Sequence, residues 1–353
     1  MRIAQVAPLI ESVPPQLYGG TERVVAFLTD ELVRQGHTVT LFASGDSTTT
    51  AKLVPACPRA LRFGGTGHDD LAPHLLMLEQ VAKRAHEFDV IHFHLAQLHF
   101  PVVRRIAAPH VTTLHGRLDI AELEPLYREF MDVPVVSISN AQRSPLPDAG
   151  WVGTVYHGLP LGLLKFRRRH HGYLAFLGRI SPEKGIDRAI AIATACGIPL
   201  RVAAKVDRAD RDYYEQHIRQ LLDTPLVEFV GEIDDRQKSA FLGGAVALLF
   251  PIDWPEPFGL VMIEALACGV PVVAFRAGSV PEVINHGITG FVVDSVEEAV
   301  EATGCVRLLD RGRCRMVFER RFAAPRMAAA YLRIYERLVR SSHAGEPLVS
   351  GAA

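Results

Sequence analysis

Residues 250–294, FPIDWPEPFGLVMIEALACGVPVVAFRAGSVPEVINHGITGFVVD, decide how the rest of the sequence is interpreted. They begin at the end of an apolar run and pass through a loop with three prolines. A helical pattern follows, which stops at Gly269 just before Pro271. A second apolar run comes next. This order predicts a strand, a helix and a second strand of a mostly parallel sheet.

Two carboxylates in this stretch, Glu256 and Glu264, are separated by seven residues. Glu256 lies in the loop, and Glu264 lies about one turn inside the helix that opens near residues 258–260. The unpaired N–H groups at a helix start attract anions, and a carboxylate can accept both hydroxyls of a diol such as ribose. A diphosphate with a sugar on each side fits this order. Alternatively, Glu256 only complements the helix dipole and Glu264 is an exposed helical residue.

A second informative segment, residues 176–187 (FLGRISPEKGID), follows another apolar run. Gly178 lets the backbone turn, and two cations, Arg179 and Lys184, come before the next helical pattern. Ligands of parallel sheets bind at the carboxyl ends of the strands. An Arg fork and a Lys point charge at that edge suit a diphosphate. The alternative is a surface ion pair with Glu183 or Asp187.

Short apolar runs alternate with helical patterns on both sides of these segments, which predicts two α/β halves joined near residue 165. The predicted strands are residues 1–7, 37–43, 90–93, 110–114, 135–138 and 154–156 in the first half, and 173–177, 200–204, 227–230, 246–250 and 270–275 in the second. Helices are predicted at residues 22–35, 185–196, 260–268 and 325–340.

Composition excludes several classes of protein. The 353 residues carry 38 Lys+Arg and 39 Asp+Glu, a net charge of −1, so a dedicated nucleic-acid binder is not expected. The five cysteines form no CxxC pair, and no apolar run is long enough to span a bilayer. The amino-terminal residues lack a signal peptide pattern, so we expect a cytoplasmic protein. A nicotinamide-dependent oxidoreductase is disfavoured because the first turn lacks G-x-G-x-x-G.

The combination of Gly-Arg-x-x-x-Glu-Lys-Gly with Glu-x7-Glu resembles the donor-binding half of retaining GT-B glycosyltransferases of family 4. Further matching pieces are Gly19-Gly20 after the first strand and the turn Val230-Gly231-Glu232-Ile233. Residues 279–282 (SVPE) and 287–290 (GITG) match near the carboxyl end. The resemblance covers nearly the whole chain.

This resemblance implies an α/β fold of two Rossmann-like domains that face each other across a cleft. The expected boundaries are an acceptor-side domain at residues 1–165, a donor-binding domain at residues 166–324, and a helix with a tail at residues 325–353 that returns to the first domain. Arg179 and Lys184 would hold the donor diphosphate, Glu264 the ribose and Glu256 the transferred sugar. The implied contacts to the distal phosphate and the base come from Gly19, Gly20, Gly231, Ile233, Phe258, Gly259 and Leu260.

His115, which follows the strand at residues 110–114, resembles the group that touches the transferred sugar, although a locally bonded strand-end histidine is the alternative. The family usually has Asn before Gly where this chain has His157-Gly158, so His157 receives no role. His92, His94 and His99 are closely spaced, but they are not accompanied by carboxylates, and no metal or other cofactor is expected.

The resemblance therefore implies an enzyme, a hexosyltransferase that retains configuration and needs no metal. The catalytic candidates are Glu256, His115, Arg179 and Lys184. The donor would be a nucleotide diphosphate sugar, with UDP favoured over GDP and ADP, and the acceptor a hydroxyl group. Peripheral membrane contact stays open because many relatives use lipid acceptors. The alternatives are a GT-B sugar phosphorylase and a non-catalytic nucleotide-sugar-binding protein.

Overall fold

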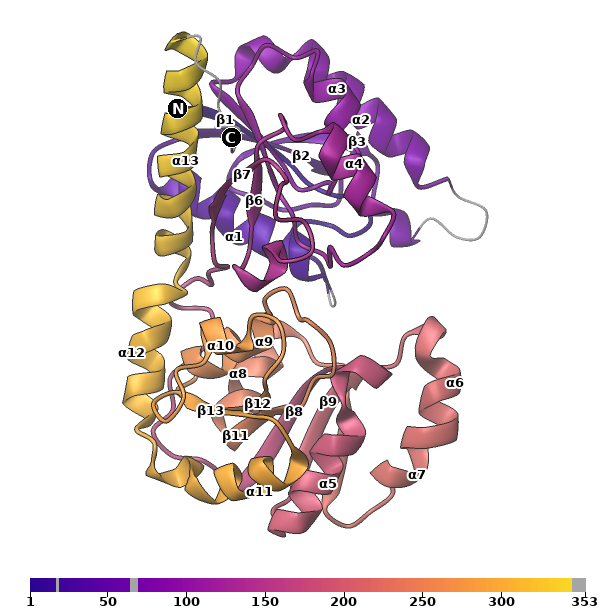
Figure 1. Ribbon diagram of the computed structural model, residues 1–353, viewed down its shortest axis with the longest axis vertical. Helices are drawn as coiled ribbons and strands as arrows, with labels where there is room; N and C mark the ends of the chain where they lie inside the picture. Colours follow the sequence, from indigo (N-terminus) through magenta and orange to yellow (C-terminus); the bar gives the residue numbers. More distant parts are fainter. Residues whose placement is uncertain (17–18, 64–68, 345–353) are drawn as a thin grey trace. The chain divides into compact units, whose positions relative to one another are not determined.

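The computed structural model describes residues 1–16, 19–63 and 69–344 and divides them into two compact units. Unit 1 comprises residues 1–158 together with the chain from Ala324 onward, and unit 2 comprises Leu159–Ala323. The chain thus leaves unit 1 after Gly158 and re-enters it at Ala324, whereas the sequence placed these boundaries at residues 165 and 325. Each unit is an α/β sandwich around its own sheet (Figure 1).

Unit 1 is built on a seven-stranded parallel sheet in the order β3-β2-β1-β4-β5-β6-β7. Its strands are β1 (Arg2–Val6), β2 (Thr38–Ser44), β3 (Lys52–Cys57), β4 (Val90–Phe93), β5 (His110–Thr113), β6 (Val135–Ser137) and β7 (Trp151–Thr154). The interior positions of β1 and β4 are buried on both faces, as expected for strands covered by helices on either side.

Helices α1 (Gly20–Arg34) and α13 (Ala324–Ala344) pack against one another in unit 1, and α2 (Leu71–Lys83), α3 (Phe100–Val103) and α4 (Leu123–Glu129) accompany the sheet (Figure 1). The 21-residue α13 is amphipathic and buries Tyr331, Tyr335 and Leu338 completely. It continues to Ala344, four residues beyond its predicted end; residues 345–353 of the predicted tail lie outside the described chain.

Unit 2 is built on a six-stranded parallel sheet in the order β10-β9-β8-β11-β12-β13. Its strands are β8 (Tyr173–Arg179), β9 (Leu200–Lys205), β10 (Val227–Gly231), β11 (Ala245–Phe250), β12 (Val272–Phe275) and β13 (Gly290–Val293). Its helices include α5 (Ile186–Cys196), α8 (Asp235–Gly243), α9 (Leu260–Ala267), α10 (Val280–Val283), α11 (Val296–Cys305) and α12 (Arg311–Arg321).

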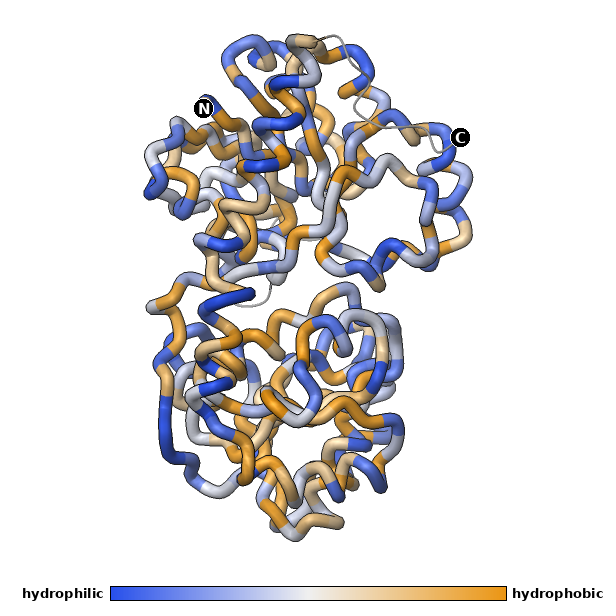
Figure 2. Tube along the Cα trace, turned by 60° about the vertical axis from the view of Figure 1, so that its left-hand side comes forward, coloured by the Kyte–Doolittle hydropathy of each residue, from blue (hydrophilic) through white to orange (hydrophobic). Residues whose placement is uncertain are grey.

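The core of unit 2 is made by buried aliphatic residues of β8, β9, β11, α5 and α11. Hydrophobic and hydrophilic stretches alternate along the chain in both units (Figure 2). Among the described residues, no helix combines the length and apolar character needed to cross a bilayer.

Both sheets change direction of strand order at one point, β1/β4 in unit 1 and β8/β11 in unit 2. Ligands of open α/β sheets bind outside the carboxyl ends of the strands at such a switch point. In unit 2, β8 ends at Arg179 and β11 at Phe250, so the two segments singled out from the sequence both leave the sheet here.

Candidate functional site

The structure brings Lys184 and Glu256 together, although 71 residues of sequence lie between them. Lys184 ends the 3₁₀ turn Pro182–Lys184 after β8, and Glu256 lies in the loop after β11. The Lys184 ammonium donates to Glu256 Oε2. The Trp254 indole N–H donates to the same oxygen at 3.1 Å, and the ammonium lies 4.7 Å from the Trp254 ring centre. The predicted alternative, a pairing of Lys184 with Glu183 or Asp187, is therefore not what the structure shows.

Backbone contacts fix the loop that carries Glu256. The Ser279 N–H donates to the Glu256 carbonyl at 3.0 Å, and the Ser279 hydroxyl donates to the Phe258 carbonyl at 2.9 Å. Gly278, with φ of +50°, allows this approach, since a Cβ there would lie 2.3 Å from the Glu256 carbonyl oxygen. The segment at residues 279–282 thus holds the proline-rich loop in place through the two hydrogen bonds of Ser279.

Gly278→Ala is expected to lower the unfolding free energy of unit 2 by more than about 2 kcal/mol, because the loop must move to admit the methyl group. Gly287→Ala is the matched control: it has φ of +73° but open space around its Cβ position, so only the strain of about 1 kcal/mol applies. Urea unfolding of both variants in the Trp151→Phe background, followed by Trp254 fluorescence, compares the two. Equal losses would show that the loop contact contributes nothing.

Arg179 sits at the end of β8 among three carboxylates. It donates to Glu183 at 2.6 Å, and Asp210 and Asp207 lie 3.5 and 3.7 Å from its guanidinium nitrogens. This ion pair with Glu183 is the one that the sequence offered as an alternative to a diphosphate contact for Arg179. Arg179 is the last residue of β8 and therefore lies at the same edge of the sheet as Lys184, with about a third of its side chain exposed.

The helix α9 begins where the sequence predicted an anion site. Gly259 caps it with φ of +74°, and the N–H groups of Gly259 and Leu260 donate to no acceptor among the described residues. Glu264 lies one turn inside and is 3% exposed, which rules out the alternative of an exposed helical residue. Its carboxylate accepts from Lys238 of α8 at 2.7 Å, a partner that no sequence pattern indicated.

Gly231 is the last residue of β10, and Ile233 follows this strand, which lies two strands away from the switch point. Gly231 has φ of +83°, and a Cβ there would meet no atom within 4 Å. Glycine is favoured at this turn because of the positive φ, since the space around the residue would admit a side chain. Ile233 is buried.

In unit 1, Gly19 and Gly20 lie at the start of α1, in the loop that follows β1. A Cβ on Gly19, whose φ is +156°, would lie 2.7 Å from the Pro15 side chain. Leu17 and Tyr18 of this predicted glycine loop lie outside the described residues.

His115 follows β5 at the switch-point edge of unit 1 and belongs to a chain of hydrogen bonds. Its Nε2 lies 2.9 Å from His94 Nδ1, and His94 Nε2 lies 2.8 Å from Gln5 Oε1. The Gln5 amide nitrogen donates to the Tyr335 hydroxyl at 3.2 Å, and that hydroxyl lies 2.7 Å from His92 Nδ1. The bond between His115 and His94 agrees with the alternative interpretation of His115 as a histidine at a strand end that is bonded to its protein neighbours.

This chain assigns the tautomer of His115. The Gln5 oxygen only accepts, so His94 carries its proton on Nε2 and its Nδ1 must accept. His115 therefore donates from Nε2 and keeps a lone pair on Nδ1. That nitrogen is buried and has no hydrogen-bond partner in the described chain. Burial lowers the pKa of His115 to about 3, so the ring is neutral near pH 7.

His92 and His99 also bond to protein groups, since their Nε2 atoms lie 2.7 and 2.6 Å from the hydroxyls of Thr113 and Thr112. Within the described ranges, no three His, Cys, Asp or Glu side chains are grouped as metal ligands. His157 stacks on His115 with ring centres 5.3 Å apart, a contact that the sequence did not indicate.

Known proteins match the chain along most of its length. The family model described as Glycosyltransferase Family 4 matches residues 18–179, and the model described as Glycosyl transferases group 1 matches residues 167–310. Glycogen synthase of Mycobacterium tuberculosis is 28% identical over 330 residues, which cover 78% of this chain and 79% of the synthase.

Two solved structures share the fold. A glycosyltransferase involved in avilamycin A biosynthesis superposes with a TM-score of 0.74 at 24% identity, covering 96% of this chain and 98% of its own. The Anabaena protein HepE, solved in complex with UDP-glucose, superposes with a TM-score of 0.71 at 20% identity, covering 95% and 99%. The two family models together span residues 18–310, and the chain belongs to the GT-B glycosyltransferases of family 4, also described as glycosyl transferases group 1.

Proposed function

We propose that this glycosyltransferase moves a hexosyl group from a nucleotide diphosphate sugar to a hydroxyl acceptor, with unit 2 binding the donor. The observation that carries the proposal is the meeting of Lys184, Glu256 and the start of α9 at the switch point of one parallel sheet. A cation and unpaired amides suit a diphosphate, and the adjoining carboxylates suit hydroxyl groups.

Lys184 is the proposed main contact to the diphosphate. An ammonium group has three N–H donors, so Lys184 can keep its bond to Glu256 and still donate to phosphate oxygens. The N–H groups of Phe258, Gly259 and Leu260 would meet the distal phosphate and the sugar. Arg179 would join them by exchanging one of its carboxylate partners for a phosphate oxygen.

Two carboxylates flank the proposed diphosphate. Glu256 would accept hydrogen bonds from the transferred sugar, and its orientation is set by Lys184 and Trp254. Glu264 would accept from the ribose hydroxyls while Lys238 holds one of its oxygens. Gly231 and Ile233 would lie beside the base.

His115 is the proposed sugar contact in unit 1, together with the backbone at Gly19 and Gly20 near the distal phosphate. Its Nδ1 lone pair can accept a hydrogen bond from a sugar hydroxyl but cannot donate one. A neutral ring also adds no positive charge next to a sugar that itself becomes positive in the transition state.

The proposed donor base is uracil, with guanine and adenine as alternatives. The support is the structural likeness to HepE, which was solved with UDP-glucose. The bond between the anomeric carbon and the diphosphate breaks through an oxocarbenium-like transition state, by analogy with glycosidases. Lys184, Arg179 and the amides of α9 would stabilise the departing diphosphate without a metal. We propose retention of configuration on the ground of the family resemblance alone.

A panel of nucleotide sugars in a thermal-shift assay tests the proposal, because a ligand of the native state raises Tm by mass action. We expect UDP-sugars to raise Tm most, and UDP alone to raise it partly. A sugar phosphorylase would instead turn over with inorganic phosphate in place of a nucleotide. No response to any nucleotide sugar would contradict the proposal.

A further inference from the structure

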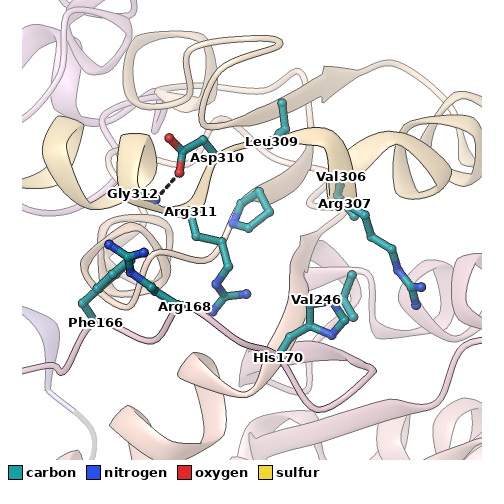
Figure 3. A pocket seen from close by; sticks show the side chains of 11 residues that line it. Phe166, Arg168, His170, Val246, Val306, Arg307, Leu309, Asp310, Arg311 and Gly312 are labelled. Carbon is teal, nitrogen blue, oxygen red and sulfur yellow. Dashed lines mark hydrogen bonds between the residues drawn. The ribbon is translucent and has the colours of Figure 1, made fainter.

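The basic segment at residues 163–171 (LLKFRRRHH) is not used by the donor site. It leads into β8 and lines a pocket of about 580 Å³ at the opposite, amino-terminal edge of the unit 2 sheet. Val246 near the start of β11 forms part of its wall (Figure 3). Pro271, just before β12, also lines it. Arg168 and His170 lie on one side of the pocket, and Arg307 and Arg311 come from the chain around the start of α12.

Arg311 places a partly buried positive charge in this wall. Its guanidinium donates at 2.8 Å to the backbone carbonyls of Arg167, Gly243 and Ala245. No carboxylate forms an ion pair with it among the described residues. Asp310 also lines the pocket, but it accepts from the Gly312 N–H at 2.7 Å and caps α12. A partly buried cation whose hydrogen-bond partners are all neutral favours the binding of an anion.

The loop that carries Arg168 and His170 is held in place on both sides. The Arg167 N–H donates to the Cys268 carbonyl at 3.1 Å, and the His171 N–H donates to the Gly244 carbonyl at 2.7 Å. The side chains of Arg168 and Arg307 form no hydrogen bond or ion pair with another residue of the described chain, so their guanidinium donors are available. Burial and the positive charges of Arg307 and Arg311 lower the pKa of His170. Both guanidinium groups therefore lie close enough to His170 to raise the positive potential around its ring.

We propose that this pocket is a second ligand site that binds a phosphate monoester of sugar size. The guanidinium groups of Arg168 and Arg307 supply the forked donors that suit phosphate oxygens, and Arg311, whose fork is bonded to backbone carbonyls, adds positive charge. Phe166, Leu309 and Pro271 supply apolar wall for the body of the ligand, and the volume lies in the range of small-molecule pockets. The concave shape favours a small ligand over an extended polyanion, which would need a flat or grooved basic surface.

Isothermal titration of the full-length protein with glucose 6-phosphate, inorganic phosphate and glucose tests the site. We expect glucose 6-phosphate to bind more tightly than phosphate, and glucose not to bind. The double variant Arg168→Gln/Arg307→Gln should weaken glucose 6-phosphate binding by about tenfold or more, since two charged hydrogen bonds are lost. Arg169→Gln, an exposed neighbour in the same loop that does not line the pocket, is the matched control and should change binding less than twofold.

Two further experiments distinguish binding at this pocket from binding at the donor site and from binding of a polyanion to the basic surface. Lys184→Ala and saturating UDP should leave glucose 6-phosphate binding unchanged; displacement by UDP would assign the phosphate to the donor site and overturn the proposal. Equal losses in Arg169→Gln and in the double variant would also overturn it, as would tighter binding of a single-stranded oligonucleotide at the same residues. Failure of nucleotide-sugar binding elsewhere in the chain would not affect this result.

Discussion

Lys184→Ala is expected to lower the rate of glycosyl transfer by about 10²–10³, the usual cost of removing one preorganised charge from a leaving-group site. The alanine variant loses the proposed diphosphate contact and also frees Glu256 from its partner, so a carboxylate would face the incoming phosphates. Both effects act in the same direction. Arg179→Ala is expected to be less severe, because Glu183, Asp207 and Asp210 already share its charge.

Initial rates with the nucleotide sugar selected by thermal shift measure this effect. Lys165→Ala is the control, since Lys165 lies in the same unit but in the segment at the opposite edge of the sheet. Circular dichroism and urea unfolding establish that each variant is folded. A folded Lys184→Ala protein with the turnover of the wild type would reject the assignment of Lys184.

Unit 1 is expected to unfold in mild acid before unit 2. Four histidines of unit 1, namely His92, His94, His99 and His157, are buried, and burial places their pKa values well below the ordinary value of 6.5. Below about pH 6.5 these histidines become protonated in the unfolded chain but stay neutral in the folded unit. Stability therefore falls as the pH is lowered, by up to about 1.4 kcal/mol per pH unit for each such group.

Several of these histidines acting together can remove much of the stability of a domain, which is typically about 5–15 kcal/mol, before pH 5. His115, with a pKa lowered to about 3, adds to the effect throughout this window. Unit 2 holds no fully buried histidine among its described residues, so its stability should change less.

The two tryptophans allow the units to be followed separately, because Trp151 lies in unit 1 and Trp254 in unit 2. Trp151 donates to the Leu146 carbonyl at 2.7 Å and is anchored in its unit. In the Trp254→Phe variant, the Trp151 emission should shift to the red between pH 6.5 and 5. In Trp151→Phe, the Trp254 emission should shift at lower pH. Simultaneous transitions at one pH, or an earlier loss of unit 2, would show that the buried histidines do not control acid unfolding.

The strands of both sheets were largely predictable because parallel strands buried on both faces form continuous apolar runs. The run at residues 90–93 matches β4, and residues 200–204 match β9 to within one residue. β3 (Lys52–Cys57) was not predicted, since it is an edge strand that contains a proline and has no buried position. β7 lies three residues earlier than expected, because Trp151 and Val152 continue the apolar pattern that was assigned to Val155 and Tyr156.

The candidate site was predictable as a set of residues but not as a set of contacts. Spacing placed Lys184 and Glu256 at strand ends, yet only the strand order β8-β11 shows that these ends are neighbours. The pairing of Glu264 with Lys238 could not be foreseen, because nothing in the sequence of α8 marks Lys238. The clustering of carboxylates around Arg179 likewise depends on Asp207 and Asp210, which come from the segment after β9.

The most direct test of the donor site is a titration of the Trp151→Phe variant with UDP and UDP-sugars, followed by the fluorescence of Trp254. This indole shares Glu256 with Lys184 and lies 4.7 Å from the Lys184 ammonium, so a diphosphate bound there must change its surroundings. We predict a saturable change in emission that is at least about tenfold weaker in affinity when Lys184→Ala is added. Unchanged emission with every nucleotide sugar, or equal affinity with and without Lys184, would contradict the account.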